Sequence, residues 1–178
     1  MRFTGGVSDT DPVLRALSHP LRLKMLNLMW PGPMSAAELA RELGVSHALA
    51  SQHLRQLDAA GLVELAEERI RRGGRERRYL TVRGTQLSDQ TEGTVVLAET
   101  LILMLRERAT RRVPGSPGVT ADGELWINPR TWDDFRRRLA DLAAELHQQA
   151  QPAHTPDTIP VAISLMTFPL EDSSPPPP

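Results

Sequence analysis

Polar and small side chains are spaced so that they share one face of a predicted helix, residues 47–59. Ser46 stands where an N-cap is expected, and the free amide groups of a helix N-terminus attract phosphate oxygens. Gln52 has the side chain that pairs with adenine, and Arg55 has one that pairs with guanine or phosphate. This pattern predicts contacts with base edges and backbone in the major groove of DNA, from Ser46, His47, Ala48, Ser51, Gln52 and Arg55. The alternative is a solvated polar face without a ligand.

Arginines gather after this helix, at the tip of a predicted hairpin. Two extended segments, 62–70 and 76–82, are joined by residues 71–75, where a glycine pair supplies the positive φ that a hairpin turn needs. An arginine-rich tip suits phosphate or minor-groove contacts, which are sensitive to salt. The predicted contacts are Arg71, Arg72, Arg75 and Arg77. A charged hairpin that serves only solubility is the alternative.

Short helices are expected to position these side chains. Ser35 and Glu38 have the spacing of a capping box, which predicts a helix over residues 36–43. Gly44 can adopt the left-handed conformation that ends this helix before the next one begins. Two short helices joined by a glycine turn and followed by a hairpin predict a winged helix-turn-helix over residues 11–83.

The stretch ALSHPLRLKMLNLM, then SAAELARELGVSHALASQHLRQLDAAGLVELAEERIRRGGRERRYLTV, resembles the ArsR-type winged-helix transcription regulators of bacteria over residues 14–82. Five motifs carry the resemblance: the SHPLR corner, the E-L-A-x-x-L-G-V-S turn, the S-x-H-L-x-x-L helix, the A-G-L-V exit and the G-R-x-R-x-Y wing. Each motif alone is weak, but the ordered combination is specific. It implies a DNA-binding regulator.

Two residues of the helix predicted over 47–59 are compared with the residues usual at these positions in the family. His53 lies where the family usually has a histidine, and both a phosphate contact and a packing or capping role are open for it. Leu49 departs from the small hydroxyl residue often found at its position, which argues against a base contact there.

Residues 84–113 are expected to form a linker and a dimerisation helix. The helix predicted over 94–112 is apolar on nearly every face, so it must be buried on all sides. It is too short to cross a bilayer and ends in arginines. We therefore expect it to pack against the same helix of a second subunit, in a homodimer.

Residues 114–170 are expected to form a small α+β lobe. A linker rich in Pro and Gly leads to an extended piece over 124–127, a helix opened by Asn128-Pro129 and a strand over 161–170. Its apolar group could form the lobe's core, could line a pocket for a small organic effector, or both: Trp126, Trp132, Phe135, Met166 and Phe168. Similar C-terminal extensions of longer ArsR-like regulators imply a dimerisation or sensing role. Residues 1–10 and 171–178 are expected to be disordered.

Charge is distributed unevenly along the 178 residues, although the net charge is only −1. Residues 1–83 carry 13 Lys and Arg against 9 Asp and Glu, and residues 84–178 carry 8 against 13. A basic half joined to an acidic half is typical of a nucleic-acid-binding part linked to a part with another role.

Several functional classes are not expected. The chain lacks cysteine, so the thiolate metal sites of the resembled family are excluded, and His147 and His154 stand in unpromising surroundings for a metal. No catalytic constellation, cofactor motif, signal peptide or transmembrane run is evident, which predicts a cytoplasmic protein that is not an enzyme, without cofactor, metal or membrane contact.

The predicted fold is mostly α with a small β part (α+β): a winged helix-turn-helix, a dimerisation helix and a C-terminal lobe. The predicted function is a homodimeric transcriptional regulator, a repressor by default, that binds a double-stranded DNA operator with inverted repeats. A small organic effector would release the DNA. The alternative is a winged-helix module that binds protein without specific DNA binding.

Overall fold

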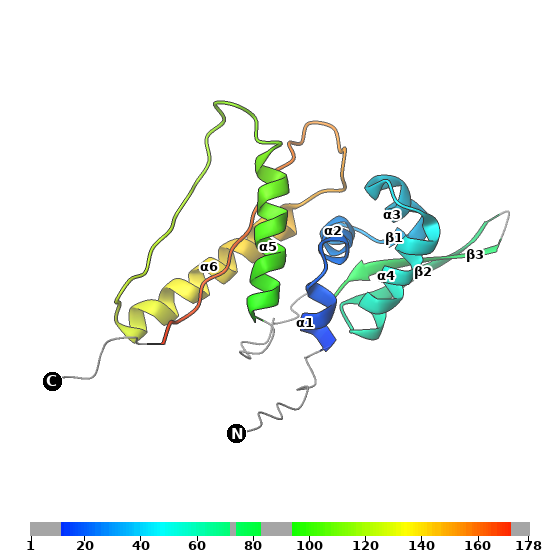
Figure 1. Cartoon of the computed structure of the whole chain (residues 1–178). Helices are drawn as coiled ribbons and strands as arrows, with labels where there is room; N and C mark the ends of the chain where they lie inside the picture. Colours follow the sequence, from blue (N-terminus) through cyan, green and yellow to red (C-terminus); the bar gives the residue numbers. More distant parts are fainter. Residues whose placement is uncertain (1–11, 72–73, 83–93, 172–178) are drawn as a thin grey trace, which may run out of the picture.

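The computed structural model describes residues 12–71, 74–82 and 94–171. Arg72, the segment 84–93, residues 1–10 and all but the first residue of the predicted tail lie outside the described residues. Within them, helices surround a small antiparallel sheet at the N-terminal end, and two longer helices follow (Figure 1).

The N-terminal domain is a winged helix-turn-helix, as predicted. The wing, a two-stranded hairpin, projects from the helices (Figure 1). Its elements follow one another as α1 (Pro12–Leu17), α2 (Pro20–Met29), β1 (Met34–Ser35), α3 (Ala36–Leu43), α4 (His47–Ala59), β2 (Val63–Arg71) and β3 (Gly74–Thr81).

Local sequence determines where α3 and α4 begin and end. The Ser35 hydroxyl accepts a hydrogen bond from the Glu38 backbone N–H, and the Glu38 carboxylate accepts one from the Ser35 N–H at 2.8 Å, which completes the predicted capping box. Gly44 ends α3 with a φ of 64°, a conformation that costs glycine little. Ser46 then caps α4 by accepting a hydrogen bond from the Leu49 N–H at 3.2 Å.

The sheet has the strand order β1-β3-β2. β2 and β3 pair from Val63 opposite Thr81 to the hairpin tip, with a bulge between Leu65 and Glu67 that leaves one extra residue on β2. The two-residue strand β1 pairs with the other edge of β3, Met34 opposite Tyr79. The sequence predicted the hairpin but not β1.

The core of the N-terminal domain is formed by apolar side chains from α1, α2, α3, α4 and β2. The largest fully buried ones include Leu14, Met25, Met29, Leu39 and Leu57. Arg22 lies on the buried face of α2 beside Met25, among apolar side chains. A buried guanidinium needs hydrogen-bond partners, which are described with the site below.

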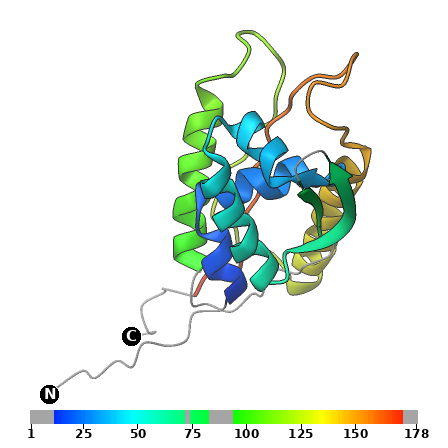
Figure 2. The same cartoon turned by 90° about the vertical axis from the view of Figure 1, so that its right-hand side faces the viewer.

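Helix α5 (Thr94–Ala109) packs against α1 and α2, alongside the N-terminal helices (Figure 2). Leu97, Thr100 and Met104 are buried in this contact, whereas Ile102 and Leu103 on other faces are exposed. These exposed faces are the ones that the expected second subunit would cover, so burial of α5 in a dimer stays a prediction. No helix among the described residues is long and apolar enough to cross a membrane.

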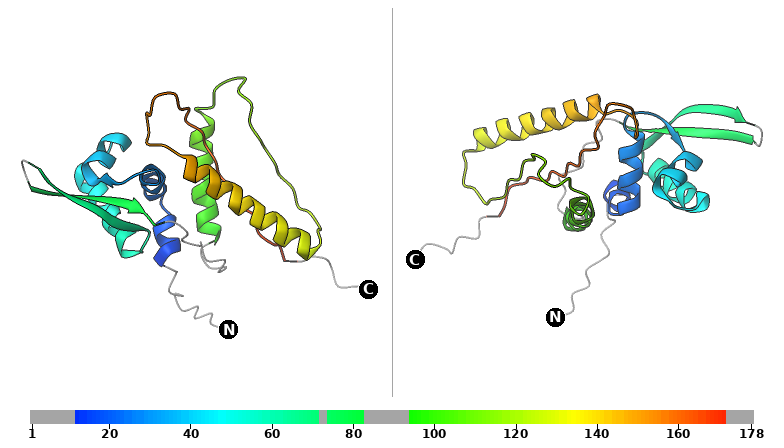
Figure 3. Two further views of the ribbon diagram at one scale, coloured as in Figure 1. Left: turned by 180° about the vertical axis from the view of Figure 1, so that it is seen from behind. Right: turned by 90° about the horizontal axis from the view of Figure 1, so that it is seen from above.

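The C-terminal part contains helix α6 (Pro129–Gln149), capped by Asn128 as predicted, and long irregular segments on both sides of it (Figure 3). The strands predicted over 124–127 and 161–170 are not formed. α6 buries none of its residues, so the predicted packed lobe with an apolar core is also wrong for the single chain. The physical reason is that a strand needs a hydrogen-bonding partner, and these segments lack one among the described residues.

Among the described residues, a ring contact and hydrogen bonds attach the C-terminal part to the rest of the chain. The ring of His147 lies 4.6 Å from that of Trp30, and His154 is 2.9 Å from the carboxylate of Glu42 in α3. Arg108 of α5 donates hydrogen bonds to the Ile163 carbonyl and the Ser164 hydroxyl. The segment around residue 163 is thus attached to α5.

The capping box of α3 provides a stability test. We expect Ser35→Ala to lower the free energy of unfolding by about 1 kcal/mol, because the Glu38 N–H loses its acceptor. The control is Ala37→Ser on the exposed side of the same helix, which should change it by less than about 0.5 kcal/mol. Urea denaturation followed by circular dichroism measures both, and equal stability of the two variants would contradict the assigned role of Ser35.

Candidate nucleic-acid interface

The exposed face of α4 carries the predicted DNA-contacting side chains. Ser46, His47, Ala48, Gln52 and Arg55 are exposed, and Ser51 is half-buried. Leu49 is also exposed, at 37%. The opposite face of α4, with Ala50, Leu54 and Leu57, is buried in the core. The structure therefore brings the predicted residues of this helix together on one accessible surface, with the sole exception of His53.

His53 lies on the buried face of α4, with only 7% of its surface exposed. Its ring packs on the ring of His19, with the centroids 4.5 Å apart, and its Nδ1 atom is buried without a hydrogen-bond partner. Of the two roles left open for His53, this position favours packing.

Arg22 joins α1, α2 and α4 beneath this surface. Its Nε donates a hydrogen bond to the Ala16 carbonyl, its Nη2 donates to the Arg15 carbonyl at 2.7 Å, and its Nη1 donates to Gln56 Oε1 of α4 at 2.7 Å. The carbonyls at the end of α1 favour a cation there. His19 begins α2, where its Nδ1 accepts a hydrogen bond from the Leu21 N–H at 3.1 Å.

The surroundings of both histidines of this cluster disfavour the protonated imidazole. Burial lowers the pKa of His19, and His53 and the guanidinium of Arg22 lower it further. Burial and Arg22 likewise lower the pKa of His53, while a hydrogen bond with Gln56 opposes the shift. Protonation of either imidazole would place a second cation beside a buried guanidinium.

The wing arginines are exposed but are partly paired with acidic residues of β2. Arg75 and Arg77 both contact Glu68, at 3.3 Å and 2.9 Å, and Arg69 contacts Glu67. Glu68 thus partly neutralises Arg75 and Arg77, which the hairpin brings to it from the other strand. These ion pairs are surface pairs that a phosphate can replace at little cost.

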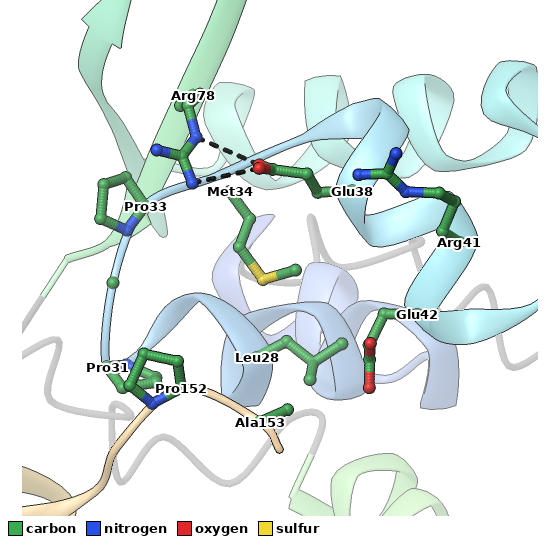
Figure 4. A pocket seen from close by; sticks show the side chains of 11 residues that line it. Leu28, Pro31, Pro33, Met34, Glu38, Arg41, Glu42, Arg78, Pro152 and Ala153 are labelled. Carbon is green, nitrogen blue, oxygen red and sulfur yellow. Dashed lines mark hydrogen bonds and ion pairs between the residues drawn. The ribbon is translucent and has the colours of Figure 1, made fainter. Parts of the chain in front are cut away.

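Arg78 differs from the other wing arginines because it faces the helices. It binds the Glu38 carboxylate at 3.1 Å and 3.3 Å (Figure 4). It also binds the Glu67 carboxylate at 2.6 Å. Burial disfavours ionised Glu38, but the hydrogen bond from the Ser35 N–H and the charge of Arg78 outweigh this and lower its pKa. The same carboxylate thus caps α3 and anchors the wing.

A cavity of about 400 Å³ lies beside this ion pair, between the end of α2, α3, β3 and the segment 152–153 (Figure 4). Its lining combines apolar side chains with charged ones, among them Leu28, Met34, Glu38, Arg41, Arg78 and Pro152.

The predicted aromatic effector pocket is not assembled in the single chain. Trp126 is 88% exposed and Phe168 is 52% exposed, and only the rings of Trp132 and Phe135 approach each other, at 6.3 Å. None of the five predicted residues, Met166 included, lines the cavity beside Arg78. No group of three or more metal-ligating side chains is found in the described part of the chain.

Sequence reasoning missed the supporting residues Arg22, His19 and Arg78. Arg22 could have been found, because it precedes Met25 and Leu26 at helical spacing and so falls on the buried face of α2. The partners of Arg78 could not, since they depend on how the wing folds back on α3.

Residues 17–66 match the family described as a helix-turn-helix domain. Over 56 residues, the chain is 41% identical to an uncharacterized HTH-type transcriptional regulator of Methanocaldococcus jannaschii; the match covers 32% of this chain and 59% of that relative. The chain therefore spans less than two thirds of that relative's length.

Solved structures that are similar include reduced HlyU from Vibrio cholerae, with 25% identity, 53% of this chain and 84% of that chain covered, and a TM-score of 0.33. The transcriptional repressor BigR from Xylella fastidiosa has 27% identity, with 53% and 83% covered and a TM-score of 0.33.

The histidine cluster predicts a stability that depends on pH. Because both pKa values are lowered from 6.5, the unfolded chain binds more protons than the folded one below about pH 6.5. The free energy of unfolding should therefore be highest above pH 6.5 and should fall as the pH is lowered toward 5. Urea denaturation at intervals between pH 7.5 and 5.0 measures this slope.

His53→Gln should flatten that slope, since one titrating group is removed. His154→Gln, at an exposed position, is the control for loss of an imidazole. An unchanged slope in His53→Gln would contradict the proposed contribution of the cluster.

Proposed function

We propose that the chain is a transcriptional regulator of the ArsR type, which binds double-stranded DNA through its N-terminal winged helix-turn-helix. The observation that carries the proposal is the exposed face of α4. This face presents Gln52 and Arg55 three residues apart, behind an N-terminus capped by Ser46. A helix of 13 residues with such a face fits the major groove.

The wing supplies the second contact in this proposal. Arg75 and Arg77 are exposed beside the tip, and DNA phosphates would compete with Glu68 for them. Arg71 and Arg72 belong to the same proposed contact. Exchange of an internal ion pair for a phosphate contact makes binding weaken as salt rises.

We propose that the DNA-binding form is a homodimer on an inverted repeat. The exposed apolar side chains of α5, including Ile102 and Leu103, support this, because a single chain leaves them in water. Two copies of α4 would enter successive major grooves about 34 Å apart. The protein bound at a promoter would exclude polymerase from it. We therefore propose a repressor that acts in the cytoplasm.

A small organic effector would release the DNA in this proposal. The cavity beside Arg78 supports it better than the exposed aromatic group does, since Pro152 of the C-terminal part and Glu38 of the helix-turn-helix both line it. A ligand there would contact both parts of the chain and bias their arrangement.

Selection from a random duplex pool, followed by titration of the enriched sequence at several salt concentrations, tests DNA binding. We expect Gln52→Ala with Arg55→Ala to weaken binding at least about 30-fold, since each base contact contributes about 1–3 kcal/mol. Arg130→Ala in α6 is the control, because it removes an exposed cation outside the winged helix. Failure to enrich any sequence, with binding that does not respond to salt, would overturn the proposal in favour of a protein-binding module.

A further inference from the structure

Helix α6 has two apolar rows, and its own chain covers only one of them. Trp132, Leu139 and His147 are half-buried against the rest of the chain. The adjacent row is left in water: Phe135 is 48%, Leu142 63% and Leu146 42% exposed. The helix lies on the side of the molecule away from the wing (Figure 3). An apolar row on the outside of a charged helix is typical of a contact surface.

The charges of α6 are divided between its two halves. The first half carries Arg130, Arg136, Arg137 and Arg138 with two aspartates, and the second half carries Asp141 and Glu145. Arg137 is paired with Asp134 at 2.5 Å, but Arg138 has no ion-pair partner among the described residues. Glu145 contacts only the neutral amide of Gln149 there, at 3.3 Å. Arg138 and Glu145 thus carry opposite charges, and neither has an ion-pair partner among the described residues.

Arg138 and Glu145 border the exposed row on the same side. They are seven residues apart, which is two helical turns, and they lie on the side away from Trp132 and Leu139. Positions at this spacing beside an apolar row determine the direction in which two helices pair.

We propose that α6 pairs antiparallel with α6 of a second copy of this chain. Antiparallel pairing about a twofold axis near Ala140 and Asp141 places Phe135 of one copy near Leu146 of the other. It also places Arg138 beside Glu145 of the second copy, twice by symmetry. Parallel pairing would place the Arg138 and Glu145 flanks of the two copies on opposite sides of the contact, so Arg138 of one copy would not reach Glu145 of the other. The surface is self-complementary in charge, which identifies the occupant as a second copy.

A segment of the same chain is a poorer occupant. The apolar stretch 161–170 is the nearest candidate in sequence, but Arg108 attaches it to α5 through Ile163 and Ser164. It also carries no charged residue that could pair with Arg138 and Glu145.

Cross-linking of the full chain tests the direction of pairing. Because the chain has no cysteine, Arg138→Cys and Glu145→Cys each introduce a single thiol. The two variants, distinguished by tags of different mass, are mixed and oxidised. We expect a disulfide-linked heterodimer as the main product and little cross-linking of either variant alone. Homodimers of each variant alone, without the mixed product, would overturn the proposal.

Charge reversal tests the same contact without cross-linking. Arg138→Glu and Glu145→Arg should each raise the dissociation constant for self-association about five- to tenfold, because each creates two like-charge contacts. The double variant should restore it, and Arg130→Glu, on the opposite face, should leave it unchanged. Sedimentation measures association, and circular dichroism checks the fold. A double variant as weak as the single ones would overturn the proposal.

This inference deepens the proposed homodimer and does not rest on DNA binding. Neither experiment contains DNA, so a failure of the α6 contact leaves the titration of the selected duplex unaffected.

Discussion

The carboxylate of Glu38 is the point on which the geometry of the winged helix depends. One oxygen accepts a hydrogen bond from the Ser35 N–H, which completes the capping box at the start of α3. Both oxygens accept hydrogen bonds from Arg78 of the wing. Because Ser35 also pairs with Arg78 in the sheet, helix start, strand pairing and ion pair are one connected unit. The pair is mostly shielded from water, with 15% of the Arg78 side chain exposed, so removal of either partner would leave a poorly solvated charge.

A second polar unit fixes α4 against the helices below it. Arg22 binds two carbonyls of α1 and the Gln56 amide of α4, so the angle of α4 depends on hydrogen bonds as well as on apolar packing. Such bonds have a preferred direction, whereas apolar contacts do not. Two separate polar groups thereby orient the exposed parts of the domain: Arg22 orients α4, and the Glu38–Arg78 ion pair orients the wing.

Features encoded by neighbouring residues could be predicted from the sequence, and features that depend on distant partners could not. The capping box, the Gly44 turn and the exposed face of α4 follow from local spacing. The strand β1 was missed because two residues become a strand only by pairing with Tyr79 and Arg78. The strand predicted over 161–170 was wrong for the same reason, since β-branched and apolar residues do not form a ladder without a partner. The sequence left a phosphate contact and a packing or capping role both open for His53, and the contact of its ring with His19 favours packing.

The bulge in β2 determines which side chains of β2 and β3 lie opposite each other in the wing. Side chains alternate between the two faces of a strand, so the one extra residue, Ala66, decides which face every later side chain of β2 occupies. With it, Glu67 lies opposite Arg78; in a regular ladder Ala66 would lie opposite Arg78 and Glu67 opposite Arg77, so the partners of the wing arginines would change together. Insertions and deletions should therefore be selected against in this short stretch far more strongly than in the irregular connection between α5 and α6, where length changes alter no pairing.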